Sequence, residues 1–182
     1  LLSREFAHTR RKNLLLRDLD ELVNQQLAKM LFANPQRIDY YDRYQEIIDA
    51  YNAEQNRATI EKTFMDLMEL ASSLDTEQQR YVREGFSSDE ELSVYDLLFS
   101  ENLTKQEIET IKKVSVDLLT KIKQQIAKLD HWTDKQETKA IVDNLIRKTL
   151  WQELPNSYDV SDIQTYQKKI YEYVYMRYPE VA

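Results

Sequence analysis

The sequence contains very little of what turns, disulfides and phosphate or metal sites are usually made from. Its 182 residues include one glycine, three prolines, two histidines and no cysteine. Tight turns between strands rely on glycine, proline and Asn-Gly pairs, so this chain has almost no room for hairpins. The lack of cysteine excludes disulfides and thiol chemistry and is compatible with a reducing compartment, so we expect a cytoplasmic protein.

The same scarcity argues against a catalytic centre. Phosphate-binding loops need several glycines because the backbone must approach the phosphate closely, so no Walker or Rossmann loop can be drawn. A di-iron site in a helical bundle needs two Glu-x-x-His motifs. The chain has one, from Glu5 to His8, and His131 lacks that spacing. We predict no catalytic, cofactor or metal site in this chain; a metalloenzyme resting on Glu5 and His8 is the least favoured of three hypotheses.

Long apolar runs are absent as well. The longest are short, such as Leu14–Leu16 and Leu97–Phe99, so no membrane span or signal peptide is expected. The net charge is −7, divided into −8 over residues 1–103 and +1 over residues 104–182. An acidic total argues against a protein that coats nucleic acid on every face, but it leaves room for a local basic stripe in the second part.

What the chain does contain is helical patterning. Apolar residues recur at helical spacing from about 11 to 32, again after Asn34-Pro35, and from about 56 to 84. Asn34 can cap a helix whose first position is the proline. Gly85, the only glycine, falls where the third helix should end. We therefore expect residues 1–85 to form a first layer of about three helices.

Four later motifs resemble capping boxes, in which a small polar residue and a Glu or Gln three residues on satisfy the free N–H groups of a helix start. They are Ser88…Glu91, Thr104…Glu107, Thr133…Gln136 and Ser161…Gln164, and the helices that they predict span about 88–101, 104–129, 133–153 and 161–178. The expected fold is all-α, an irregular bundle of about seven helices with no sheet. Residues 86–182 form the second layer, and we expect the two layers to pack as one unit.

Two kinds of side chain could form interaction surfaces. The tyrosines cluster in the second and in the last predicted helix, and tyrosine is favoured at interfaces, although packing of half of each cluster is an open alternative. Basic residues recur across two consecutive helices of the second layer. Those that we assign to DNA contact are Lys121, Lys123, Lys128, Lys135, Lys139, Arg147 and Lys148. The alternative is a solvated face, because Asp117, Asp134 and Asp143 are interspersed among them.

Two stretches carry a resemblance to a known family. One is SDEELSVYDLL, at residues 88–98, and the other is Asp130-His131-Trp132 followed by Lys135 and a helix to Leu150. Together they resemble the C-terminal helical region of the R (motor) subunit of type I restriction endonucleases, over roughly residues 50–155. Because the chain opens at Leu1 without a methionine, we read it as a piece of such a subunit.

The resemblance implies a non-catalytic domain of a larger enzyme. The R subunit of that family is an ATP-dependent site-specific deoxyribonuclease, and its nuclease and motor domains, which use ATP and Mg²⁺, would lie upstream of this chain. None of the family's catalytic motifs is present here. The C-terminal region would help to dock the motor onto the methyltransferase and specificity subunits and would contact double-stranded DNA without reading its sequence.

Three residues of the resembling stretches are candidates for packing or for partner contact, namely Tyr95, Asp96 and Trp132, with packing favoured for the aromatic pair. The competing hypothesis is a helical protein–protein scaffold with no nucleic-acid role. The tyrosine clusters and the acidic total charge motivate it.

Overall fold

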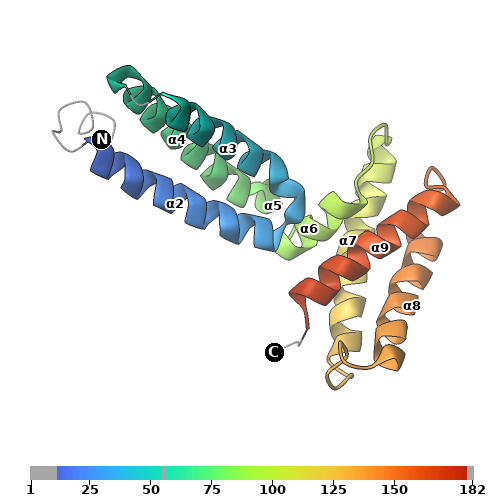
Figure 1. The fold of residues 1–182 in the computed structure, drawn as a ribbon. Helices are drawn as coiled ribbons and strands as arrows, with labels where there is room; N and C mark the ends of the chain where they lie inside the picture. Colours follow the sequence, from blue (N-terminus) through green and yellow to red (C-terminus); the bar gives the residue numbers. More distant parts are fainter. Residues whose placement is uncertain (1–11, 55, 180–182) are drawn as a thin grey trace. The chain divides into compact units, whose positions relative to one another are not determined.

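The computed structural model describes residues 12–54 and 56–179 and confirms the all-α prediction (Figure 1). The described part is 81% helical and contains eight α-helices and no strand. None of the helices in that part is long and apolar enough to cross a membrane.

The chain divides into two compact units between Arg83 and Glu84, close to the boundary expected at Gly85. That the two units pack as one body stays a prediction. The described elements of the first unit are α2 (Lys12–Ala33), the 3₁₀-helix η1 (Pro35–Arg37), α3 (Ile38–Ala53), α4 (Arg57–Gln78) and the short α5 (Arg80–Arg83).

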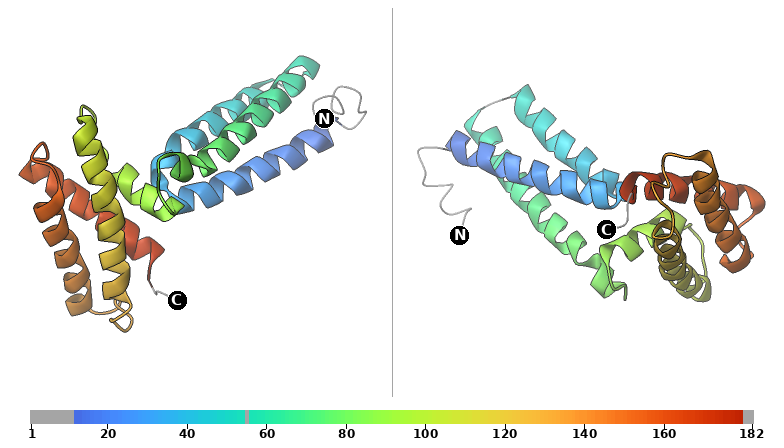
Figure 2. Two further views of the ribbon diagram at one scale, coloured as in Figure 1. Left: turned by 180° about the vertical axis from the view of Figure 1, so that it is seen from behind. Right: turned by 90° about the horizontal axis from the view of Figure 1, so that it is seen from below.

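In the first unit, α4 packs against both α2 and α3, and the three helices lie side by side (Figures 1 and 2). Their shared core consists of apolar residues at helical spacing on each inner face, namely Leu16, Val23, Leu27, Met30, Tyr44, Phe64, Leu67, Leu70 and Leu74. The Tyr44 hydroxyl donates to the Asp20 carboxylate at 2.7 Å. The ring can therefore be buried while its polar end stays bonded.

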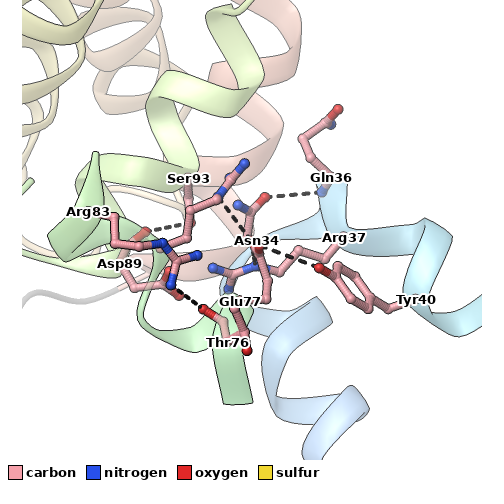
Figure 3. Close-up of polar contacts among 10 residues, drawn as sticks. Asn34, Gln36, Arg37, Tyr40, Thr76, Glu77, Arg83, Asp89 and Ser93 are labelled. Carbon is pink, nitrogen blue, oxygen red and sulfur yellow. Dashed lines mark hydrogen bonds and ion pairs between the residues drawn. The ribbon is translucent and has the colours of Figure 1, made fainter. Parts of the chain in front are cut away.

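A buried ion pair connects η1 to α4 in the first unit (Figure 3). Arg37 of η1 donates from Nε to the Glu77 carboxylate on α4 at 3.0 Å, and both side chains are nine-tenths or more buried. Arg80 also pairs with Glu77, at 3.1 Å. Such a pair gains its attraction in a medium of low polarity, so loss of one partner leaves the other charge buried and costly.

Two expected boundaries in this unit differ from the structure. Asn34 accepts from the Gln36 N–H and caps η1, so the α-helix itself begins later, at Ile38. The third predicted helix breaks at Gln79, whose N–H bonds to the Thr76 carbonyl and tightens the last turn of α4. The Arg83 guanidinium donates to that same carbonyl at 2.9 Å (Figure 3). Gly85 follows α5 with φ of 84°, a conformation that suits glycine.

The second unit contains α6 (Asp89–Leu98), α7 (Lys105–Ile126), α8 (Gln136–Glu153) and α9 (Val160–Arg177). Helix α6 contacts α7, α7 contacts α8, α8 contacts α9, and α9 returns to α6, which closes a four-helix arrangement. Its centre consists of fully buried aliphatic side chains, among them Leu92, Leu98, Ile111, Leu118, Ile122, Ile146, Leu150, Ile170 and Val174.

Two of the four predicted caps act at the helix starts. The Ser88 side chain accepts from the Glu91 N–H, and the Glu91 carboxylate accepts from Ser87 rather than from Ser88. Thr104 and Glu107 form the complete reciprocal box. The Thr104 hydroxyl and N–H both donate to the Glu107 carboxylate, and these hydrogen bonds lower the pKa of that carboxyl.

The predictions for Thr133 and Ser161 were wrong. Helix α8 begins at Gln136 after Lys135, which makes no side-chain cap; residues before it form a turn in which the Asp134 N–H bonds to the His131 carbonyl. Helix α9 begins at Val160, and its cap is Asp159, which forms a reciprocal box with Asp162. This box was missed because aspartate, rather than Glu or Gln, stands three residues after the cap.

Candidate nucleic-acid interface

The seven basic residues that the sequence assigns to DNA contact lie in different environments, and the two on α7, Lys121 and Lys123, form ion pairs with carboxylates of neighbouring helices. Lys121 forms ion pairs with Asp117 and with Glu153 of α8. The hydrogen bonds from its ammonium group to these carboxylates raise the pKa of Lys121. Its charge is therefore already compensated within the unit.

Lys123 lies on another side of the same helix. It forms an ion pair with Glu90 of α6, and its Nζ lies 5.1 Å from the centre of the Tyr178 ring. Residues two apart on a helix do not share a face, so Lys121 and Lys123 could not have formed one surface. Both contribute to contacts between helices.

Three of the remaining lysines lie around the connection between α7 and α8. Lys128 follows the end of α7, Lys135 precedes α8, and Lys139 is in the first turns of α8. Within residues 12–54 and 56–179, Lys128 and Lys135 are exposed and form no ion pair. Lys139 is half-buried, with its Nζ 5.7 Å from the centre of the Tyr175 ring. These three lysines, the connection lysines, are the strongest candidates for contact with an anionic ligand.

A groove between α8 and α9 adjoins the connection lysines. Its volume is about 570 Å³. Its lining residues carry amide, ammonium, carboxylate and phenol groups and are Gln136, Lys139, Ala140, Asp143, Gln164, Gln167, Lys168 and Tyr171. Burial raises the pKa of Tyr171. Lys168 is a further cation at this groove, from α9, with its Nζ 3.9 Å from the exposed Glu172 carboxylate. Sequence reasoning missed it, although the adjacent lysines at 168 and 169 were a visible signal.

Arg147 and Lys148 lie at the other end of α8. Lys148 is 13 residues from Lys135, which corresponds to about 20 Å along the axis at about 1.5 Å per residue. Both side chains are exposed, and the Arg147 guanidinium donates to Asn144 at 3.0 Å. The basic residues therefore form two separated groups rather than one continuous stripe.

The charge of the second unit is less basic than the sequence division suggested. Residues 84–182 carry 13 Lys and Arg against 18 Asp and Glu, a formal charge of −5. The acidic start of α6 belongs to the same unit, with Asp89, Glu90 and Glu91 in its first turn. Any contact with a polyanion is therefore local to the surfaces where cations are free of carboxylates.

The three packing or partner candidates lie in different environments. Trp132 is 1% exposed, and its Nε1 donates to the Tyr178 carbonyl at 2.7 Å. Tyr95 is also buried, with its ring against Phe86 and Phe99 at centroid distances of 5.4 and 5.8 Å. Asp96 is half-buried on α6. Both aromatic residues contribute to the interior of the unit.

Much of the tyrosine cluster at the end of the chain also packs internally. Tyr171 and Tyr175 contact the edge of Trp132 at centroid distances of 6.2 and 5.7 Å. Burial raises the pKa of Tyr173 and of Tyr178. Of the four tyrosines Tyr171, Tyr173, Tyr175 and Tyr178, Tyr175 is the one that is exposed.

The Glu5 and His8 pair lies outside the described residues. Among the residues that the structure does describe, no group of three or more His, Cys, Asp or Glu could hold a metal ion.

A comparison with protein families matches residues 2–178 to the family described as type I restriction enzyme HindI endonuclease subunit-like, C-terminal. No curated protein and no solved structure matches the chain.

Proposed function

Because this chain belongs to the family of C-terminal domains of type I restriction enzyme HindI endonuclease subunit-like proteins, we propose that it is a non-catalytic domain of the motor subunit of such an enzyme. In this proposal it contributes to assembly with the methyltransferase and specificity subunits and contacts double-stranded DNA without reading its sequence. ATP and Mg²⁺ serve the nuclease and motor domains elsewhere in the subunit, and the enzyme acts in the cytoplasm.

The connection lysines carry the DNA part of the proposal. Lys128 and Lys135 are exposed cations with no ion pair in the described part of the chain. Lys139 and Lys168 line the adjoining groove. Lysine binds phosphate as a mobile point charge, and such contacts position a duplex through its backbone. Because Lys121 and Lys123 are held in ion pairs, they are not part of this surface in the proposal.

The test is charge reversal with a matched control. Lys128→Glu/Lys135→Glu should weaken binding of a labelled duplex at low salt by about tenfold or more, because each lost phosphate contact also loses its counterion release. Lys29→Glu/Lys62→Glu changes the net charge equally at exposed positions in the first unit. Fluorescence anisotropy measures both. Equal binding by the two variants would overturn the DNA part of the proposal.

A protein scaffold without a nucleic-acid role is the second candidate. The formal charge of −5 on residues 84–182 favours it. It predicts that the Lys128→Glu/Lys135→Glu variant assembles with the other subunits and differs from the unaltered protein in no measurement of duplex affinity.

A further inference from the structure

The outward face of α8 carries a partly apolar strip, from Ile141 to Trp151, that the DNA proposal does not use. Trp151 is 49% exposed and Ile141 is 42% exposed. Asn144 and Lys148 lie between them in the sequence. The spacing i, i+3, i+7, i+10 places all four on one helix face, and we call them, together with Arg147, the α8 strip.

The α8 strip is positively charged as well as apolar. Arg147 and Lys148 precede Trp151 by one helical turn. Lys148 forms no ion pair within the residues described, and the polar contact of Arg147 is to the neutral amide of Asn144. The nearby carboxylate of Glu153 already pairs with Lys121. The strip therefore presents two uncompensated cations beside a large aromatic ring.

This combination of side chains is better suited to binding a protein partner than to binding a phosphate backbone. Phosphate contacts require cations but gain nothing from half-exposed Trp and Ile side chains. Tryptophan and arginine, in contrast, are the residues that dominate binding energy at the centres of protein interfaces. The charged and aromatic part of the strip also lies apart from the connection lysines, because Lys148 and Trp151 are about 14 and 18 Å along α8 from Lys139, beyond a Debye length of about 8 Å at physiological salt. It can therefore act separately from the connection lysines.

We propose that the α8 strip is the docking surface for a protein partner that presents carboxylates around an apolar centre. Carboxylates of that partner would pair with Arg147 and Lys148, and its apolar centre would pack against the exposed faces of Trp151 and Ile141. The inference rests on the proposed function, in which the partner belongs to the methyltransferase–specificity core. It moves Arg147 and Lys148 from DNA contact to assembly.

The test uses the complete subunit that carries this chain and the assembled methyltransferase–specificity core as the probe. Trp151→Ala and Arg147→Glu/Lys148→Glu should each weaken binding to the core by about tenfold or more, as expected for a central aromatic anchor and its charged neighbours. Met176→Ala is the matched apolar control, because Met176 is exposed and belongs to α9, a different helix from the strip. Biolayer interferometry measures the affinities, and far-UV circular dichroism checks the fold.

Four other outcomes overturn the inference in distinguishable ways. If a subunit lacking residues 84–182 fails to bind the core while the strip variants bind normally, the strip is wrong and the proposed function stands. If that deletion leaves assembly unchanged, both the inference about the strip and the proposed assembly role are wrong. If the strip variants instead weaken duplex binding, the face belongs to DNA. If they abolish only self-association in sedimentation experiments, the occupant is a second copy of the chain, whose α3 displays exposed carboxylates.

Discussion

The two tryptophans show how one residue type serves opposite purposes in this unit. Trp132 is buried, with its indole N–H bonded to the Tyr178 carbonyl and its ring against Tyr171 and Tyr175. Trp151 is half exposed on the outer face of α8. The contrast makes them a matched pair for separating internal packing from surface interaction.

Replacing Trp132 by alanine should lower the free energy of unfolding by about 3–5 kcal/mol, because it removes a fully buried ring and leaves the Tyr178 carbonyl without its donor. Trp151→Ala should change it by no more than about 0.5 kcal/mol, because the site is at the surface. Urea denaturation followed by circular dichroism compares the two. A larger effect at Trp151 would contradict the assignment of its ring to an exposed docking surface.

The buried carboxylate of Glu77 supports a second prediction at this scale. Glu77→Ala should destabilise the first unit by about 3–5 kcal/mol, because it removes the buried carboxylate that pairs with both Arg37 and Arg80. Glu69→Ala is the control on the same helix. Its partner Arg43 lies 2.8 Å away, but Glu69 is 72% exposed, so the loss should be about 0–1 kcal/mol. Thermal and urea unfolding measure both, and equal losses would show that the buried ion pair of Glu77 contributes no more than the exposed one of Glu69.

At the scale of elements, a helix begins after a cap residue whose backbone is extended. In this protein the turn before the helix fixes which residue that is. Before α9, the Tyr158 N–H bonds to the Pro155 carbonyl, and Tyr158 itself is buried with its hydroxyl donating to the Leu98 carbonyl at 2.7 Å. These contacts leave Asp159 extended at the helix start. Ser161 therefore lies inside the helix, although its sequence pattern resembles a cap.

The cap assignment predicts unequal effects of two neighbouring substitutions. Asp159→Ala should lower the free energy of unfolding by about 0.5–2 kcal/mol, because the Asp162 N–H loses its acceptor. Ser161→Ala should change it by less than about 0.5 kcal/mol, since alanine suits a helix interior and Ser161 is exposed. Thermal denaturation ranks the two variants. A larger loss of stability for Ser161→Ala than for Asp159→Ala would instead support Ser161 as the helix cap.

At the scale of the whole molecule, the distribution of charge limits the proposed DNA contact to a local surface. The chain carries −7 in total, and the connection lysines are three cations in a unit of formal charge −5. Each neutralised phosphate contributes about −0.9 to the slope of log affinity against log salt. A surface of three lysines is therefore limited to a slope of about −3.

This limit is a measurable property of the intact chain. If the proposed function holds, duplex binding should show a salt slope between about −2 and −3, because Lys128, Lys135 and Lys139 are the proposed contacts. Anisotropy titrations from low to physiological salt provide the slope, and a slope near zero would support the scaffold alternative. A slope steeper than about −4 would mean that further cations participate, with Lys168 the first to test.

Helix content and the positions of most helices could be predicted from the sequence alone. Apolar spacing and the scarcity of glycine and proline are local properties, and the all-α class follows from them. The Thr104 box is equally local, because its partners are three residues apart. Family membership could also be recognised from short motifs such as residues 88–98, and the family comparison bears it out.

The composition of the candidate surface was decided only by the tertiary structure. Helical periodicity says which lysines share a face of one helix, but not which carboxylate from another helix reaches them. Glu90 and Glu153 are 33 and 32 residues from their lysine partners Lys123 and Lys121. Ion pairing across helices depends on packing between distant segments, so the fold alone determined which cations are compensated and which remain free to bind.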